Sequence, residues 1–369
     1  MRGLDAVSLR RIRAWDWPVI TLILSVKALL FIFAVQAVTT LSRESFPGWM
    51  EIWNRWDAVH YLALAEHGYV ATGEGRVSLV FYPLYPGLVH LAAFLTQNYL
   101  AAAFVVSGIA SVGAGLLLKR LARLDSGEEV AQNAVWFLFI FPTSYFLHIG
   151  YTESLFLALT LACFLAARSG RWAIAGVIGM FACLTRVNGL ILMPALALEA
   201  FSQYRTARRI NWRWLWIGIM PVGFIAYLLI NYHVTGDFFA FSKIMEEHWF
   251  KKLKPPWIGI RDVWLRIPDD VTEGLHEFFY IVLVFVCTIW CWWRSRPSYA
   301  IWMTCNWLLI NSTSFVLSVP RYALTLFPIF ILFAQASTGR RFWYLTLSVG
   351  SLLYLGHYAG RFVQGLWAF

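Results

Sequence analysis

The sequence predicts an all-α protein that crosses a membrane several times. Hydrophobic residues make up 60% of its 369 residues and charged residues only 14%, whereas soluble chains carry about 25% charged residues. Apolar runs close to the ~20 residues that cross a bilayer recur along the chain. Because a backbone inside a bilayer must satisfy its own hydrogen bonds, we expect these runs to be helices. We also expect a single integral-membrane domain over residues 1–369.

The apolar runs and the polar segments between them predict about eleven spans. We expect these at residues 18–40, 98–118, 130–147, 151–168, 171–186, 188–203, 214–231, 278–293, 298–317, 322–338 and 342–358. Short cytoplasmic loops are enriched in Lys and Arg. The side of the membrane on which the basic clusters fall therefore tests the predicted series of spans. With the N-terminus in the cytoplasm, the cytoplasmic segments hold Arg10, Arg11 and Arg13; Lys119, Arg120 and Arg123; Arg168 and Arg171; Arg205, Arg208, Arg209 and Arg213; Arg294 and Arg296; and Arg340 and Arg341. This agreement predicts a cytoplasmic N-terminus and a C-terminus outside.

Two larger loops lie on the outer side in this topology, at residues 41–97 and 232–277. We predict that residues 84–97 form a helix along the outer surface, because a span there would move Lys119 and Arg120 to the outer side. The first outer loop would then contain juxtamembrane helices. The chain has no detectable repeat of one half in the other, which argues modestly against a secondary transporter.

The net charge of +10 does not indicate a nucleic-acid-binding protein. The basic residues occur mainly in short clusters between apolar runs, where anionic lipid headgroups are the expected partner. No soluble domain is present in which basic and aromatic side chains could hold a nucleic-acid strand. The five cysteines lie within apolar runs, and no Cys-x-x-Cys pair occurs. We interpret them as buried small hydrophobic residues.

The most informative segment is the aromatic stretch around Asp57 in the first outer loop. On a helix, residues three, four and seven or eight apart share a face, which would place Asp57 at the centre of one stripe. Its members would be Trp53, Asp57, His60, Tyr61 and Leu64. We interpret Asp57 as a general base that accepts a proton from an acceptor hydroxyl. His60 would orient Asp57 or touch the sugar, and Trp53 and Trp56 would stack on sugar faces. The alternative is an interfacial helix anchored by aromatic residues, which leaves the aspartate unexplained.

A very short outer turn provides three further candidates for substrate binding: His148, Tyr151 and Glu153. Glu153 follows Thr152, a residue type that commonly caps helices, and an acidic residue in the first turn favours the helix dipole. Glu153 is also predicted to lie on the same side of the membrane as Asp57. Helix capping and acceptor binding therefore both remain open for Glu153.

Two arginines stand at the outer ends of spans, away from the cytoplasmic clusters. A departing lipid phosphate keeps its negative charge, so Arg186 and Arg321 are candidates to stabilise it. The alternative is that both extend to lipid headgroups. Tyr322, next to Arg321, and Lys243, in the second outer loop, are also candidate substrate-binding residues. The sequence contains no Gly-rich phosphate loop after a strand, and we expect no metal ion or other cofactor.

Five short segments occur in an order that indicates a family. They are Trp56–Tyr61, Phe81–Pro86, Tyr151–Ser154, Thr185–Arg186 and Pro320–Tyr322. Together they resemble the PIG-V family, whose eukaryotic members are the second mannosyltransferase of GPI-anchor synthesis. The resemblance runs from about residue 50 to about residue 330. This family belongs to the GT-C membrane glycosyltransferases, so the resemblance implies a GT-C-type bundle of about eleven transmembrane helices.

The resemblance also implies a chemistry. The donor would be mannose on a polyprenyl or dolichyl phosphate, the transfer would invert the anomeric centre, and Asp57 would be the base. The acceptor would be an extracytoplasmic glycan or glycolipid, and membrane lipids would surround the protein. Because the chain is short for a eukaryotic member, we expect a bacterial inner-membrane protein, or an endoplasmic reticulum protein if the source is eukaryotic.

Two alternatives stay open at this point. The same fold could use another polyprenyl-phosphate sugar, or the chain could be a lipid or sugar transporter without transferase activity. A transporter places its polar groups near the middle of the bilayer. A transferase of the type described above would gather them at the outer rim.

Overall fold

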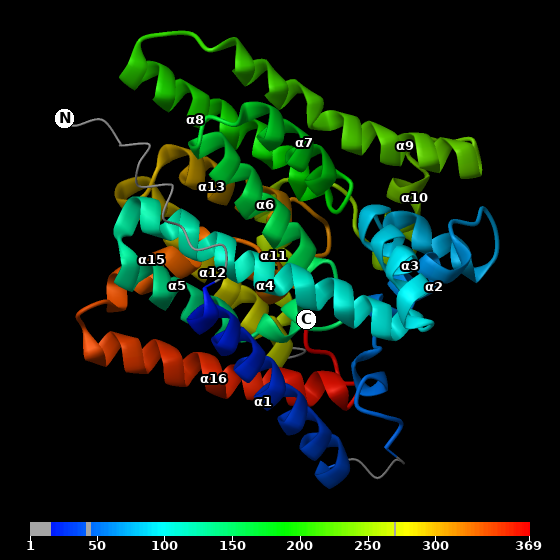
Figure 1. The fold of residues 1–369 in the computed structure, drawn as a ribbon. Coiled ribbons are helices and arrows are strands. Elements are labelled where there is room, and N and C mark those ends of the chain that lie inside the picture. Colours follow the sequence, from blue (N-terminus) through cyan, green and yellow to red (C-terminus); the bar gives the residue numbers. More distant parts are fainter. Residues whose placement is uncertain (1–15, 42–45, 269–270) are drawn as a thin grey trace.

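The computed structural model describes residues 16–41, 46–268 and 271–369. The described chain is helical throughout, and its only pairing of strand type is one isolated bridge between Leu253 and Thr313. Figure 1 shows long helices stacked side by side, with shorter helices gathered at one end of the bundle. The predicted basic cluster at Arg10, Arg11 and Arg13 lies outside the described residues.

The helices follow one another in this order: α1 (Trp17–Leu41), η2 (Glu51–Trp53), α2 (Asp57–His67), η3 (Glu74–Val80), α3 (Leu84–Thr96), α4 (Tyr99–Ser126), α5 (Glu128–Ile140), η4 (Ser144–Leu147), α6 (Glu153–Arg168), α7 (Trp172–Cys183), η5 (Val187–Ile191), α8 (Leu192–Ala207), η6 (Trp212–Ile219), α9 (Pro221–Thr235), α10 (Ala240–Trp249), α11 (Pro256–Arg266), α12 (Val271–Arg294), α13 (Pro297–Asn311), α14 (Val319–Leu324), α15 (Pro328–Ser337) and α16 (Arg341–Val363). The η elements are short 3₁₀ helices.

The protein is an integral membrane protein with several helical spans. Among the described residues, four helical stretches are long and apolar enough to cross a bilayer: Trp17–Thr40, Tyr99–Ser126, Trp212–Thr235 and Thr272–Arg294. A fifth would arise if η3 and α3 formed one span, but the two are bent by 114°. Apolar helices such as α7 and α15 are shorter than this test requires. The count of eleven spans therefore stays a prediction.

Several predicted segments are shorter or more broken in the structure. The segment predicted as span 130–147 is helical as α5 only to Ile140 and continues as η4, and the segment 298–317 ends as a helix at Asn311. The predicted span 322–338 is divided between α14 and α15. Pro328 begins α15 and cannot donate the backbone hydrogen bond that would join the two helices. The helix predicted at 84–97 is present as α3, and its place along the outer surface stays a prediction.

Helix α4 is central to the packing and lies against α3, α5 and α6. Its buried face contains small residues such as Ala103, Ser107 and Gly115, which allow neighbouring helices to approach closely. A Cβ atom at Gly115 would lie 2.6 Å from Cδ1 of Ile23 and 3.0 Å from Cε2 of Phe139. The close approach of α1 and α5 to α4 therefore requires glycine at this position.

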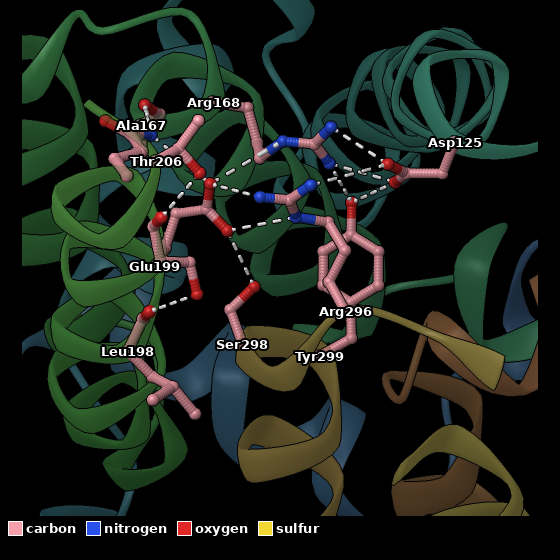
Figure 2. A network of polar contacts seen from close by, with 11 residues as sticks. Asp125, Ala167, Arg168, Leu198, Glu199, Thr206, Arg296, Ser298 and Tyr299 are labelled. Atoms are coloured by element: carbon pink, nitrogen blue, oxygen red, sulfur yellow. Dashed lines mark hydrogen bonds and ion pairs between the residues drawn. The ribbon is translucent and has the colours of Figure 1, made fainter. Parts of the chain in front are cut away.

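A network of paired charges joins α4, α6, α8 and α13 at one end (Figure 2). The guanidinium of Arg168 donates two hydrogen bonds of 2.9 Å to Asp125, and Tyr299 Oη donates to the same carboxylate at 2.9 Å. Arg296 donates to Glu199 at 2.9 Å. Both arginines belong to clusters that the sequence places in the cytoplasm, and here they are neutralised by acids.

The two loops predicted to lie outside, residues 41–97 and 232–277, contact each other. Helix α10 of the second loop packs against η3 of the first, and Arg76 pairs with Glu247 across this contact at 3.2 Å. Figure 1 shows α2, α3 and α10 together at one end of the bundle. Residues of both loops are thereby brought together at this end of the bundle.

Candidate active site

A cavity of about 410 Å³ lies where the outer loops meet the helix ends. Its lining comes from six segments of the chain. These include Asp57 and Tyr61 of α2, Phe81 and Tyr82 after η3, Arg186 and Asn188 near η5, Trp249 at the end of α10 with Lys251 just after it, Arg321 and Tyr322 of α14, and Trp367 after α16. The cavity lining therefore contains five of the twelve predicted site residues, namely Asp57, Tyr61, Arg186, Arg321 and Tyr322.

Helix α2 begins at Asp57, and this fixes which aromatic residues can accompany the carboxylate. Trp56 has φ 54° and ψ −123°, so the helix cannot extend back through it. The predicted helical face is therefore wrong for Trp53, whereas Asp57, His60, Tyr61 and Leu64 lie on one helix as predicted. Trp53 lies in η2, is 1% exposed, and packs its ring within 5.9 Å of Tyr145 and 5.8 Å of Phe362.

Trp53 thus belongs to the hydrophobic core and does not line the cavity. Trp56, in contrast, is 42% exposed. Its ring meets Trp367 edge-on at 5.1 Å, and Trp367 is part of the cavity lining. Of the two tryptophans assigned to sugar stacking, only Trp56 lies beside the cavity.

Two carboxylates and two guanidinium groups alternate at the base of the site. Arg321 Nη1 donates to Asp57 Oδ2 at 2.7 Å, and Arg186 Nη1 donates to Glu153 Oε1 at 2.5 Å. Arg321 Nε lies 3.5 Å from the same oxygen of Glu153. All four side chains are at most 20% exposed. Because a buried charge without a partner is strongly destabilising, the four groups stabilise one another as a unit.

The surroundings of Glu153 differ from both interpretations given above. Thr152 makes no side-chain cap hydrogen bond to α6, and its hydroxyl instead accepts a hydrogen bond from Arg186 at 3.1 Å. Glu153 is 1% exposed and is absent from the cavity lining. The geometry indicates that Glu153 positions Arg186 and Arg321 from below.

His60 lies beside the cavity. Its ring stacks on Phe81 at 5.3 Å and meets Trp249 at 6.4 Å. Burial lowers the pKa of His60, and the nearby carboxylate of Asp57 partly opposes this shift. The imidazole is therefore neutral near pH 7 and packs as an aromatic ring.

The tyrosines around the charged groups form a compact layer. Tyr61 Oη lies 3.5 Å from the hydroxyl of Thr152. Tyr151 donates from Oη to the carbonyl oxygen of Arg55 at 2.9 Å, and its ring lies 5.6 Å from the Arg321 guanidinium carbon. Tyr151 thereby holds the turn before α2 and supports Arg321.

Two predicted binding residues lie away from the cavity. His148 is completely buried, its ring packs 5.6 Å from Phe139, and neither ring nitrogen has a hydrogen-bond partner among the described residues. Lys243 is 68% exposed and pairs with Asp237 at 2.6 Å, which lowers the pKa of that carboxyl. Neither residue lines the cavity. Their assignment as substrate-binding residues therefore stays a prediction that the geometry of the cavity does not support.

The sequence analysis missed Trp249 and Lys251, which line the cavity. A signal was present, because Lys251, Lys252 and Lys254 form a basic cluster in a loop predicted to be outside. Such a cluster departs from the usual cytoplasmic placement of lysine. The departure could have indicated a function for one of these residues.

The analysis also missed Glu277, which fixes the start of α14. Its two carboxylate oxygens accept hydrogen bonds from the backbone N–H groups of Ser318 at 2.6 Å and Val319 at 2.8 Å. Ser318 has φ 72°, a left-handed conformation that a side chain rarely adopts. Glu277 thereby holds the strained turn that leads to Arg321.

No group of three or more His, Cys, Asp or Glu side chains that could hold a metal ion occurs in the part of the chain that the structure describes. The cavity lining offers one carboxylate, several cations and a layer of aromatic rings. Such a set can accept a proton, stabilise negative charge and stack on a sugar.

No protein-family model matches the chain. Part of the chain is nevertheless similar to curated mannosyltransferases. GPI alpha-1,6-mannosyltransferase 2 of Cricetulus griseus is 31% identical over 149 residues, which are 37% of this chain and 29% of that relative. GPI mannosyltransferase 2 of Schizosaccharomyces pombe is 26% identical over 167 residues, which are 42% of this chain and 34% of that relative. The matches thus span about a third of the length of these relatives.

The chain is a distant, partial homologue of GPI mannosyltransferase 2. The resemblance to the PIG-V family is confirmed to that extent.

The fold is also similar to solved structures of other proteins. ArnT of Cupriavidus metallidurans, in a crystal structure with bound undecaprenyl phosphate, aligns with a TM-score of 0.51 at 17% identity and covers 89% of this chain and 61% of its own. The oligosaccharyltransferase of Archaeoglobus fulgidus in its apo form aligns with a TM-score of 0.52 at 12% identity and covers 94% and 56%. At this identity the likeness shows the fold alone. The fold is GT-C-like.

Proposed function

We propose that the protein is a GT-C glycosyltransferase that moves mannose from a polyprenyl or dolichyl phosphate to an extracytoplasmic glycan or glycolipid. The partial homology to GPI mannosyltransferase 2 supports mannose as the sugar. The bound undecaprenyl phosphate of the ArnT structure supports a lipid phosphate as the carrier. The acceptor is assigned only by class.

The observation that carries this proposal is the single carboxylate on the cavity wall. Among the described residues that line the cavity, Asp57 is the only acidic one. Its carboxylate is oriented by Arg321 at 2.7 Å, and aromatic rings surround it. A retaining enzyme usually needs a second carboxylate as nucleophile, and the nearest one, Glu153, is buried below the arginines. One accessible carboxylate supports inversion.

The proposed step uses these groups as follows. The acceptor oxygen attacks the anomeric carbon, and its proton passes to Asp57. The bond between the anomeric carbon and the phosphate oxygen breaks on the opposite face, and the electron pair leaves with the lipid phosphate. The phosphate changes from a singly charged diester to a doubly charged monoester, so cations near it stabilise the transition state.

We propose that the site faces the non-cytoplasmic side of a cell membrane, in a topology of about eleven spans with a cytoplasmic N-terminus. The grouping of Asp57, Arg186 and Arg321 at one end of the bundle supports this arrangement, because the charge distribution of the loops places all three on the same side. A bacterial inner membrane is the proposed location. Polar groups gathered at the rim are less suited to a transporter.

The experiment is transfer by the purified full chain, with labelled polyprenyl-phosphate mannose and a native lipid extract. We expect one labelled lipid or glycan product, and loss of at least about 100-fold in turnover for Asp57→Asn, as is typical of a lost general base. The matched control is Glu66→Gln on the same helix, where the side chain is 51% exposed. If Asp57→Asn keeps wild-type turnover, Asp57 takes no part in the mechanism. If the protein instead transfers another sugar from its polyprenyl phosphate, mannose is not the donor sugar.

A further inference from the structure

Three cations surround the ring of Tyr322 at the cavity. The guanidinium carbon of Arg186 lies 5.3 Å from the ring centroid, that of Arg321 lies 5.7 Å from it, and Nζ of Lys251 also lies 5.7 Å from it. Cations at this distance interact with the face of an aromatic ring. The first two come from helix ends of the bundle, whereas Lys251 comes from the second outer loop.

The three cations differ in how they are neutralised. Arg186 pairs with Glu153, and Arg321 pairs with Asp57 and lies near Glu153. Lys251 has no carboxylate within 4.0 Å among the described residues. Of the three cations around Tyr322, Lys251 is therefore the one without a carboxylate at ion-pair distance.

The backbone around Lys251 is held in place. Its N–H donates to the carbonyl oxygen of Met245 at 3.1 Å, which closes the end of α10. The neighbouring N–H of Lys252 donates to the hydroxyl of Ser314 at 2.9 Å, and the N–H of Ser314 donates to the carbonyl oxygen of Lys252 at 2.8 Å. The lysine loop is thus paired with the segment that leads from α13 to α14.

We propose that Lys251 binds the phosphate of the lipid-linked donor, while Arg186 and Arg321 position the two carboxylates. This inference rests on the proposed function and changes the role given above to the arginines. A guanidinium already paired with a carboxylate must break that pair to bind a phosphate, whereas the ammonium of Lys251 is available. As the sugar leaves and the phosphate gains its second negative charge, Lys251 stabilises the added charge.

Lys254 provides a matched control for this proposal. It lies three residues further along the same loop, is exposed, and does not line the cavity. The test measures binding of labelled undecaprenyl phosphate to the full chain in detergent, with unlabelled undecaprenol and inorganic phosphate as competitors. We expect Lys251→Gln to weaken binding at least about tenfold, which corresponds to about 1.4 kcal/mol. We expect Lys254→Gln to leave it unchanged and Lys251→Arg to restore most of it.

A second measurement avoids variants altogether and covers the case in which Lys251→Gln does not fold. Lysines of the wild-type protein are acetylated with and without undecaprenyl phosphate, and the modified sites are counted by mass spectrometry. We expect Lys251 to be protected by the lipid phosphate and Lys254 to react equally in both samples.

In the transfer assay, Lys251→Gln should raise KM for the donor and leave KM for the acceptor unchanged.

The outcomes separate the two proposals. If the wild-type protein binds undecaprenyl phosphate no better than undecaprenol, the proposed function and this inference both fail. If the wild type prefers the phosphate but Lys251 is neither protected nor needed, only the assignment to Lys251 fails. If inorganic phosphate competes as well as undecaprenyl phosphate, the ligand is free phosphate and the assignment to a lipid donor is wrong.

Discussion

Replacing Arg321 by methionine tests whether the buried charges form one unit. Arg321 donates to Asp57 at 2.7 Å and lies 3.5 Å from Glu153. Removing one partner of a buried pair costs about 3–5 kcal/mol. The Asp57 side chain is 20% exposed, so we expect a loss near the lower end, roughly 3 kcal/mol of unfolding free energy. The measurement is thermal or denaturant unfolding in detergent.

A second substitution separates lost pairing from lost packing. In the double variant Arg321→Met with Asp57→Asn, no charge of Asp57 is left unpaired, so we expect about 1–3 kcal/mol of the loss to be recovered. Transfer activity should stay absent, because the proposed base is missing. The control is Arg76→Met, which removes an exposed pair with Glu247 at 3.2 Å and should cost roughly 1 kcal/mol or less. Additive losses in the double variant would refute the paired unit.

Three further predictions concern the surroundings of the site. Glu277→Ala removes the acceptor of two backbone hydrogen bonds, each worth about 1.5–3 kcal/mol for a charged group, and should lower both melting temperature and turnover. Gly115→Ala places a Cβ 2.6 Å from Ile23 and should destabilise by about 1–3 kcal/mol, whereas Gly113→Ala on the same helix meets nothing within 4 Å and should not. The pKa of His60 is lowered in the folded protein, so its contribution to stability should be lost as pH falls below about 6.5. A pH series of melting temperatures for the wild type and His60→Gln checks this, and parallel curves would contradict it.

The sequence was sufficient to predict that Asp57 and Arg321 lie on the same side of the membrane, although it did not predict that they form an ion pair. Charge distribution placed Asp57 and Arg321 on the same side of the membrane, and the structure joins them at 2.7 Å. The helical class and the helix at residues 84–97 followed from hydropathy and charge in the same way. These features depend on patterns that extend over many residues, which periodicity and loop charge report well.

The features that were missed depend on single backbone angles or on contacts between loops. The helical face was extended through Trp56, because nothing in the sequence indicates a positive φ at a tryptophan. Lys251 reaches the cavity only because its loop pairs with residues near Ser314. Glu277 fixes a turn that is 41 residues away. Local propensity carries no information about such tertiary contacts.

The charge network of Figure 2 lies at the far end of α6 from the cavity, because this helix begins at Glu153 and ends at Arg168. At 1.5 Å per residue the two ends are separated by about 22 Å. Sliding α4 past α6 or α8 past α13 would break the pairs of Arg168 and Arg296. The paired charges therefore fix α4, α6, α8 and α13 against one another at the end of α6 that lies away from the cavity.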